Sequence, residues 1–198
     1  KGKGHWVGLP VRREVLEGSV EAGKKLCGFE SGSGRKVILV MGGSLGAKAI
    51  NEAVAAILPD LVKNFDVIHL AGKGKLIDFT SPHYRAFEFL REGYADVVAA
   101  ADIVVCRAGA NSIFELLALA KPMLLIPLVR GSRGDQVDNA RLFTEQGWAA
   151  TLAESDLTAA SLKAAIEQLD TQGDAMRQRQ QEYDGKKSAE KVLAELLN

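Results

Sequence analysis

Apolar and polar positions along this chain form short apolar runs that alternate with longer amphipathic segments. The short runs predict buried strands at Val37–Met41, Val67–Ala71, Ala86–Leu90, Ile103–Cys106, Met123–Pro127 and Ala149–Leu152. Apolar residues at helical spacing predict helices near Ala47–Val62, Tyr94–Ala101, Ser112–Ala120, Gln136–Glu145 and Thr158–Leu169, with a last one around Asp174–Leu197. Strands of this kind between helices are typical of a parallel sheet covered on both faces. We therefore expect an α/β fold, with a Rossmann-like doubly wound parallel sheet of about six strands in the order 3-2-1-4-5-6.

The clearest candidate chemistry follows the strand at Ile103–Cys106, where a tight turn at 107–110 leads into a helix. We expect this helix to begin at Asn111 or Ser112, with Glu115 one turn inside it. Unpaired N–H groups and the positive dipole end of such a helix suit a phosphate or diphosphate. A carboxylate one turn inside can accept hydrogen bonds from ribose hydroxyls. The alternative is a capped turn in which Glu115 merely favours the helix start.

A second turn of the same kind follows the strand at Val37–Met41. The loop Gly42–Gly46 (GGSLG) precedes a helix, and its glycines let the backbone approach a ligand without a Cβ in the way. Ser44 can cap the helix or donate to a phosphate. The glycine spacing fits neither a dinucleotide fingerprint nor a P-loop. Two such turns in one sheet favour a ligand site in the crevice where the strand order reverses.

A third strand-to-helix connection, at 129–139, contains amide side chains. Gln136 and Asn139 lie three residues apart, so they share one helix face near its amino-terminal end and could bind sugar hydroxyls. We expect Asp135 to cap this helix, which does not exclude ligand contact by Gln136. Arg130 and Arg133 in the loop either cover a diphosphate or are simply solvated.

Composition narrows the class of protein. The 198 residues include 25 Lys and Arg against 25 Asp and Glu, so no overall field attracts nucleic acid and we expect no such partner. Cys27 and Cys106 lack metal-ligand spacing and are expected to be reduced thiols. No apolar run approaches the ~20 residues that span a bilayer, and no signal peptide is visible. Because the chain does not begin with Met, we expect that it is processed, tagged or cut from something larger.

Five motifs in a fixed order give the chain a resemblance to a known family. They are GLPVRREVL at Gly8–Leu16, GGSLGAKAIN at Gly42–Asn51, FEFL at Phe87–Leu90, ADIVVCRAGANSIFELLALAKP at Ala101–Pro122 and DQVDNA at Asp135–Ala140. Over nearly its whole length the chain resembles the carboxyl-terminal, donor-binding domain of the peptidoglycan N-acetylglucosaminyltransferases, which are GT-B enzymes of glycosyltransferase family 28. Leu9 departs from the usual Asn of the first motif, and Asn111 stands at a position that varies in the family.

The resemblance implies a set of residues that bind UDP-N-acetylglucosamine. Ser44 and Arg12 would lie near the diphosphate, and the Leu90 backbone would meet the uracil. Residues 109–112 would form the phosphate-binding helix start, Glu115 would hold the ribose, and Gln136 would reach the GlcNAc hydroxyls. The candidate residues are Arg12, Ser44, Leu90, Arg107, Gly109, Ala110, Asn111, Ser112, Glu115 and Gln136, with Gly43, Gly46, Asp135 and Asn139 as weaker candidates.

The resemblance also implies a reaction, in which an inverting transferase moves GlcNAc to lipid I and forms lipid II in peptidoglycan synthesis. Helix-end N–H groups with Arg12 or Arg107 would stabilise the departing diphosphate. No Asp-x-Asp metal motif is present, and we expect neither a metal nor a cofactor. His5, His69 and His83 are poorly placed for a general base, so we expect no catalytic residue in this chain.

A two-domain enzyme follows from the same resemblance, with the acceptor site, the general base and most of the membrane contact in an amino-terminal domain absent from this chain. We expect residues 1–34 to form an interdomain segment and linker, and residues 35–172 to form the nucleotide-sugar-binding domain. Residues 173–198 would form a helix that crosses back to the missing domain. The full enzyme would be peripheral at the cytoplasmic face of the bacterial membrane, whereas this fragment would be soluble and inactive alone.

Other functions remain open from the sequence. One is a related UDP-sugar glycolipid synthase, or a donor-binding subunit that pairs with a separate acceptor protein. Another is a dehydrogenase or epimerase domain, which would need a dinucleotide glycine fingerprint and an acidic residue at the end of the second strand. The segment GKGKLIDF after that strand supplies no such acid at the strand end. A binding domain that only senses a ligand is a further alternative.

Overall fold

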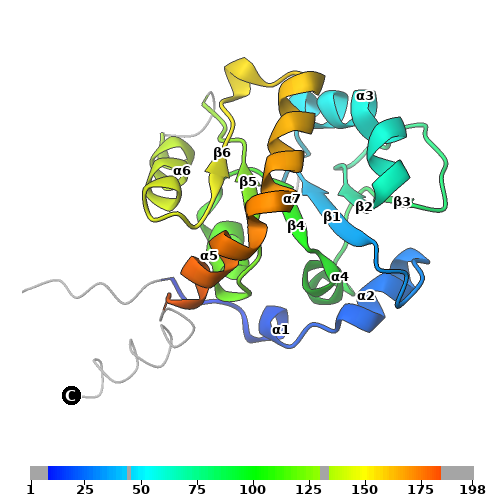
Figure 1. The fold of residues 1–198 in the computed structure, drawn as a ribbon, viewed down its shortest axis with the longest axis horizontal. Helices are drawn as coiled ribbons and strands as arrows, with labels where there is room; N and C mark the ends of the chain where they lie inside the picture. The colour runs from blue at the N-terminus through cyan, green and yellow to red at the C-terminus, as the bar shows by residue number, and fades with distance from the viewer. Residues whose placement is uncertain (1–8, 44–45, 130–133, 184–198) are drawn as a thin grey trace, which may run out of the picture.

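The computed structural model describes residues 9–43, 46–129 and 134–183, which form one sheet with helices on both faces (Figure 1). The strands are β1 (Lys36–Met41), β2 (Phe65–Leu70), β3 (Tyr84–Phe87), β4 (Ile103–Cys106), β5 (Met123–Leu125) and β6 (Ala150–Thr151). They lie in the order β3-β2-β1-β4-β5-β6, and all five neighbouring pairs are parallel. The predicted order is therefore confirmed. Strands β2 and β3 are added on one side of β1, and β4, β5 and β6 are added on its other side, so the strand order reverses between β1 and β4.

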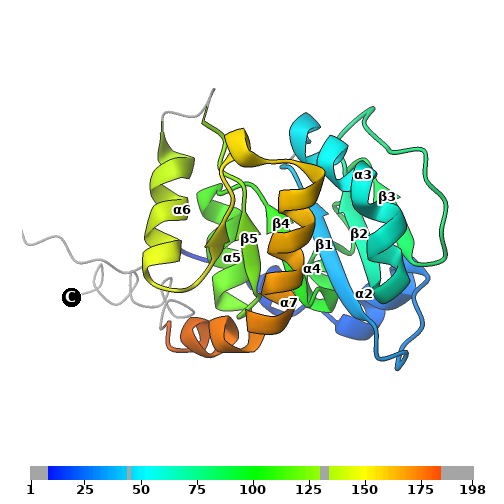
Figure 2. The same ribbon diagram turned by 45° about the horizontal axis from the view of Figure 1, so that its top comes forward.

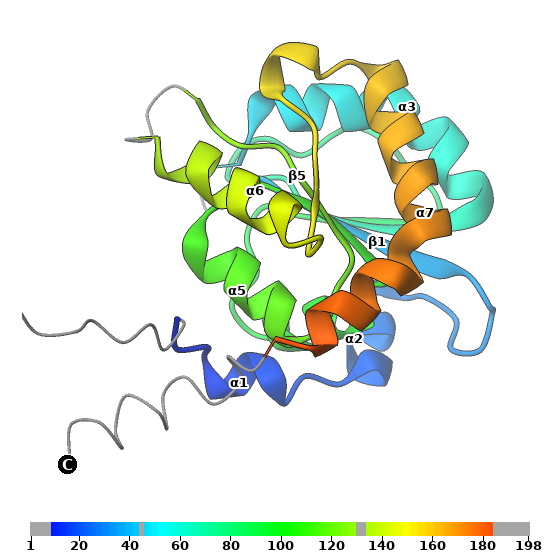
Figure 3. The same cartoon turned by 60° about the vertical axis from the view of Figure 1, so that its left-hand side comes forward.

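The helices that cover the sheet differ between its two faces. They are α1 (Arg13–Leu16), α2 (Val20–Cys27), α3 (Lys48–Asn64), α4 (Tyr94–Ala100), α5 (Ala110–Ala118), α6 (Asp135–Glu145) and α7 (Ala159–Gln181), with a short 3-10 turn η1 at Glu154–Asp156. Helices α3 and α7 lie together on one side, and α1, α2 and α5 lie on the other (Figure 3). Figure 2 shows α6 on the side of the molecule where β6 forms the edge of the sheet, opposite the edge that β3 forms.

The sheet has one hydrophobic core on each face, because successive side chains along each central strand point to opposite faces. In β1, Leu39 belongs to the cluster that includes α4 and α5, whereas Ile38 and Val40 belong to the cluster that includes α3 and α7. In β4, Val104 and Val105 divide in the same way. Both faces of these strands are apolar because both are covered, which explains why the sequence shows continuous apolar runs rather than polar alternation.

Several predicted boundaries are wrong by a few residues. Helix α5 begins at Ala110 with Gly109 as its N-cap, before the expected Asn111 or Ser112. Strand β3 ends at Phe87, so Leu90 of the predicted strand lies beyond the sheet. This strand pairs with β2 only, and its partner β2 ends at Leu70 in register with Phe87.

The sequence predicted two helices in the carboxyl-terminal part, at Thr158–Leu169 and around Asp174–Leu197, and the break between them is wrong. Helix α7 runs without interruption from Ala159 to Gln181 and includes Gly173. Gly173 is buried, and a Cβ there would lie 3.3 Å from the Pro122 ring, so this glycine permits close contact rather than ending the helix. The rest of the expected helix, 184–197, lies outside the described residues.

The amino-terminal segment contains two helices that the sequence did not predict. Helix α2 is packed against α4, with Gly18 and Gly23 at the contact. A Cβ at Gly23 would lie 2.2 Å from the Asp96 carbonyl oxygen, so the glycine lets the two backbones approach each other. The linker-like stretch at 30–34 does form exposed turns before β1, as expected.

Candidate functional site

A cavity of about 870 Å³ opens at the carboxyl ends of the strands, where the strand order reverses. Its walls come from the segments that follow successive strands. These segments contribute Gly42, Gly43, Gly46 and Ala47 after β1, Leu70 from β2, Glu88, Phe89, Leu90 and Arg91 after β3, Cys106, Arg107, Gly109 and Ser112 around the β4–α5 turn, and Leu128 after β5. The cavity therefore occupies the place that the sequence predicted from its glycine turns.

Four helices begin beside this cavity, and each has an N-cap residue that makes no side-chain cap. The N-caps are Ala47 for α3, Gly93 for α4, Gly109 for α5 and Gly134 for α6, and none makes a side-chain cap hydrogen bond. By contrast, Ser19 and Thr158 cap α2 and α7 with side-chain oxygens. Uncapped helix starts offer N–H donors and a positive dipole end to an anion.

The charged residues that line the cavity are balanced in number. Three arginines and three acidic residues line it, namely Arg12, Arg91, Arg107, Glu14, Glu88 and Asp96. Two of these carboxylates already accept backbone N–H bonds, from Gly74 to Glu88 at 2.9 Å and from Ser19 to Asp96 at 2.8 Å. Any preference for an anion would therefore come from where the helix ends and guanidinium groups lie, not from an excess of positive charge.

Glu115 is buried beneath Arg12. The Arg12 Nε atom donates to Glu115 Oε1 at 2.7 Å, and Nη2 donates to Oε2 at 3.1 Å. The Glu115 side chain is 5% exposed, that of Arg12 is 59% exposed, and only Arg12 is among the residues that line the cavity. The hydrogen bonds to Glu115 raise the pKa of Arg12 above its ordinary value. Arg12 thus covers the carboxylate that the sequence assigned to a ribose.

Tyr94 completes this group, and the sequence did not single it out. Its ring lies 5.4 Å from the Arg12 guanidinium carbon, and its hydroxyl lies 4.0 Å from the Met41 sulfur. Burial, with a smaller contribution from Glu115, raises the pKa of Tyr94 to about 12, so the hydroxyl is neutral. Gly93 before Tyr94 was a sequence signal for a helix start, but nothing in the sequence alone indicated that α4 opens into the cavity.

Arg107 lines the cavity but is already paired. Its Nη1 atom donates to the Ile126 carbonyl at 3.0 Å, and its Nη2 atom forms an ion pair with Glu154. The arginine side chain is 12% exposed. These two contacts use two of its five N–H donors, so the guanidinium has donors left for a ligand in the cavity.

Of the two amide residues of α6, Gln136 faces the cavity and Asn139 does not. Gln136 lines the cavity, and its Oε1 atom accepts from the Leu128 N–H at 3.0 Å, which leaves the Nε2 atom as the donor end. Asn139 instead donates to the Ala108 carbonyl at 3.0 Å and supports the β4–α5 turn. Asp135 is exposed and is the first helical residue, so the prediction that it caps α6 is wrong. Gly134 has φ 91°, which favours glycine at the N-cap.

The remaining candidates divide between the cavity wall and the outer surface. Leu90, Gly109, Ser112, Gly43 and Gly46 line the cavity. Ala110 and Asn111 are exposed and are not among the lining residues. Ser44 lies outside the described residues.

No described histidine lines the cavity. His69 is fully buried in β2, and His83 precedes β3 at the opposite edge of the sheet, where it contacts Asp66. Cys27 and Cys106 are free and buried, and burial raises the pKa of Cys106 to about 12. Among residues 9–43, 46–129 and 134–183, no group of three or more His, Cys, Asp or Glu could hold a metal ion. No helix in the same ranges is both long and apolar enough to cross a bilayer.

Comparison with known sequences places the chain in a family. Residues 37–197 match the family described as Glycosyltransferase family 28 C-terminal domain, so the chain belongs to that family. It is 46% identical over 201 residues to the UDP-N-acetylglucosamine--N-acetylmuramyl-(pentapeptide) pyrophosphoryl-undecaprenol N-acetylglucosamine transferase of Geobacillus thermodenitrificans. It is 51% identical over 171 residues to the protein of the same name from Geobacillus kaustophilus. These alignments cover 99% and 84% of this chain but only 55% and 47% of the two relatives.

Solved structures support the fold. Acinetobacter baumannii MurG has a TM-score of 0.66 and 22% identity, covering 90% of this chain and 50% of that protein. The glycotransferase of kitacinnamycin has a TM-score of 0.69 and 21% identity, covering 89% of this chain and 43% of that protein. In both cases this chain matches half of the neighbour or less, and its parallel α/β architecture is GT-B-like.

Proposed function

We propose that this chain is the donor-binding half of an N-acetylglucosaminyltransferase of peptidoglycan synthesis and that its cavity binds UDP-N-acetylglucosamine. The observation that carries the proposal is the convergence of four uncapped helix starts on one cavity, in a chain of glycosyltransferase family 28. The names of its relatives, which specify transfer of N-acetylglucosamine, support the choice of donor.

The two glycine-containing turns are proposed to hold the donor diphosphate. The N–H groups at the α3 and α5 starts would donate to phosphate oxygens, with Ser44 beside them and the Arg12 guanidinium opposite. Arg12 would then divide its donors between Glu115 and the phosphate, because a carboxylate and a phosphate both accept from its fork. Residues 109–112 thus remain candidates for backbone contacts, although the Ala110 and Asn111 side chains are exposed.

Recognition of the nucleoside and sugar is proposed to come from three other residues. The Leu90 backbone would meet the uracil edge, since Leu90 lies on the cavity wall just beyond β3. Glu115 would accept from the ribose hydroxyls once Arg12 shares or releases it. The Nε2 atom of Gln136 would donate to a GlcNAc hydroxyl, because its Oε1 atom is already bonded to the Leu128 N–H.

The proposed reaction inverts the anomeric carbon of the donor. The C1–O bond to UDP breaks as a lipid I hydroxyl attacks, and the helix-end N–H groups stabilise the charge that develops on the diphosphate. The general base and the lipid I site would belong to an amino-terminal half, because the described histidines lie away from the cavity. Residues 1–34 would connect the halves, 35–172 would bind the donor, and 173–198 would return to the other half. The complete enzyme would act peripherally at the cytoplasmic face of the membrane.

Calorimetric titration of the 198-residue chain with UDP-GlcNAc, UDP-glucose and NAD tests the proposal. We expect binding of both UDP-sugars and no measurable binding of NAD, because the glycine turns lack the dinucleotide spacing. Equal or tighter binding of NAD would instead favour a dehydrogenase or epimerase domain, and no binding of any UDP-sugar would reject the proposed donor.

A further inference from the structure

Three buried polar side chains form a hydrogen-bond chain behind the cavity. They are Asn51 of α3, His69 of β2 and Tyr84 of β3, and each is less than one-tenth exposed. Tyr84 Oη lies 3.1 Å from His69 Nδ1, and His69 Nε2 lies 3.1 Å from Asn51 Oδ1. Asn51 Nδ2 donates to the Ala71 carbonyl at 2.9 Å. The chain therefore crosses two strands and one helix and ends at a backbone oxygen.

The direction of every proton in this chain follows from its last link. The Ala71 carbonyl can only accept, so the Asn51 amide must present Nδ2 to it and Oδ1 to His69. His69 must then carry its proton on Nε2, which leaves Nδ1 to accept from the Tyr84 hydroxyl. The Tyr84 hydroxyl, which can donate or accept, adapts to this order by donating to Nδ1, and its hydrogen bond holds the His69 ring in the position that Asn51 requires.

The Ala71 carbonyl also lies directly against the backbone of Gly46, the last glycine of the loop after β1. A Cβ at Gly46 would lie 2.1 Å from this oxygen, so the two backbones are in direct contact. Gly46 has φ 67°, its N–H donates to the Gly43 carbonyl at 2.9 Å, and its carbonyl accepts from Lys75 Nζ at 3.2 Å. Because Gly43 and Gly46 line the cavity, a shift of Ala71 would move the cavity wall.

We propose that Asn51, His69 and Tyr84 form a positioning relay that fixes the Ala71 carbonyl and thereby holds Gly43 and Gly46 in place at the cavity wall, where they approach the donor diphosphate. None of the three contacts the nucleotide in this proposal, so they are positioning residues. The ligand part of the proposal rests on the proposed function, whereas the effect on the turn itself does not.

Two variants test the relay. Tyr84→Phe removes one hydroxyl remote from the cavity, and Asn51→Leu removes the group that holds Ala71. The affinities of UDP and of uridine are measured by calorimetry for each variant. We expect UDP binding to weaken by about fivefold, as for loss of one neutral hydrogen bond, with uridine binding unchanged because uridine lacks the diphosphate. A general loss of folded protein would affect both ligands alike.

A second measurement follows the turn without any ligand. Backbone amide exchange should become faster at Gly46 in Tyr84→Phe and should stay at the parent rate at Ile113, in the α5 start. This measurement decides the relay even if the parent chain binds neither UDP nor uridine, an outcome that would reject the proposed function instead.

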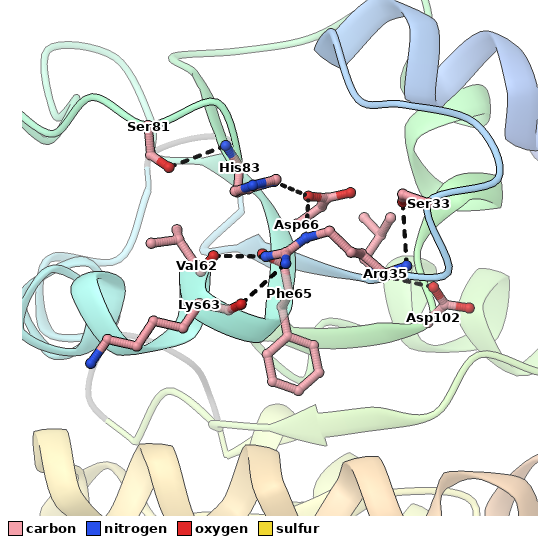
Figure 4. Close-up of polar contacts among 10 residues, drawn as sticks. Ser33, Arg35, Val62, Lys63, Phe65, Asp66, Ser81, His83 and Asp102 are labelled. Carbon is pink, nitrogen blue, oxygen red and sulfur yellow. Dashed lines mark hydrogen bonds and ion pairs between the residues drawn. The ribbon is translucent and has the colours of Figure 1, made fainter.

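A matched control comes from a second buried polar cluster, at the amino-terminal edge of the same strands (Figure 4). Asp66 lies near the start of β2. Its Oδ1 atom accepts from Arg35 Nε at 3.1 Å and lies 2.8 Å from His83 Nδ1. Arg35 also donates to the Val62, Lys63 and Phe65 carbonyls at the end of α3. Asp66→Asn should therefore lower stability without altering the ratio of UDP to uridine affinity.

The relay is supported if Tyr84→Phe and Asn51→Leu lower that ratio and speed exchange at Gly46 while Asp66→Asn does neither. It is overturned if both relay variants keep the parent ratio and the parent exchange rate. It is equally overturned if Asp66→Asn produces the same changes, since the turn would then respond to any loss of buried polar contacts.

Discussion

Glu115 reaches the cavity only past Arg12, and this arrangement sharpens the test of its proposed role. Both carboxylate oxygens accept from Arg12, so a buried helix carboxylate in a structural ion pair would look the same as one awaiting a ribose. Glu115→Ala should weaken UDP binding by about 1.5–3 kcal/mol if the ribose hydroxyls donate to it, as for hydrogen bonds to a charged group.

A comparison of UDP with 2′-deoxy-UDP isolates that contact. The parent chain should prefer UDP because the 2′-hydroxyl donates to Glu115, and Glu115→Ala should remove this preference. The control is Arg12→Met, which leaves the carboxylate in place and should keep the preference while weakening both ligands. A preference that survives in Glu115→Ala would assign Glu115 to its ion pair with Arg12 alone.

His69 gives the stability of the chain a pH dependence of known sign. Burial lowers the pKa of His69 to about 4 from its ordinary value of 6.5, so the folded chain holds it neutral. Between these values the unfolded chain binds a proton that the folded chain does not, and stability falls as the pH falls from about 6.5 to about 4. The loss amounts to about 3 kcal/mol.

Denaturant unfolding across this pH range measures the effect. The variant His69→Gln should be less stable than the parent at neutral pH, and its stability should fall less steeply on acidification. Carboxylates titrate in both proteins, so only the difference between the two slopes reports on His69. Parallel slopes would show that His69 does not titrate differently in the folded and unfolded chains.

At the scale of elements, the contact between α2 and α4 depends on the absence of side chains at Gly18 and Gly23, of which Gly23 lies within α2. Gly23→Ala would place a Cβ 2.2 Å from the Asp96 carbonyl oxygen, which belongs to the backbone and cannot move by rotamer change. We expect a loss of about 3 kcal/mol in the free energy of unfolding, because the helices must separate. Gly109→Ala is the control, since a Cβ there meets nothing within 4 Å. Unchanged stability of Gly23→Ala would mean that α2 moves freely on α4.

The strands and their order were predictable because a doubly covered parallel sheet requires apolar residues on both strand faces, as in β1 and β4. Helices α1 and α2 were not, since the glycines that allow α2 to approach α4 suggest a linker when only local sequence is considered. The cavity turns were predictable from glycine after an apolar strand. The pairing of Arg12 with Glu115 was not, because the two residues are 103 positions apart in sequence and no local pattern joins them.

At the scale of the whole molecule, the donor cavity is built from the ends of strands within this chain, so UDP should bind without another domain. In the proposed site, Gln136 is the one described side chain assigned to the sugar, whereas several groups are assigned to the nucleoside diphosphate. We expect UDP and UDP-GlcNAc to bind within about tenfold of each other, a difference below ~1.4 kcal/mol.

Transfer tests whether binding and catalysis are divided between two halves. The chain matches only about half the length of its relatives, and neither described histidine reaches the cavity. Incubation with UDP-GlcNAc and a lipid I analogue should therefore give no product from this chain, because the proposed function assigns the general base to the amino-terminal half. The same chain joined to the amino-terminal half of a relative should form product, and Arg12→Met in that fusion should lower the rate. Measurable transfer by the 198-residue chain alone would place the base among these residues.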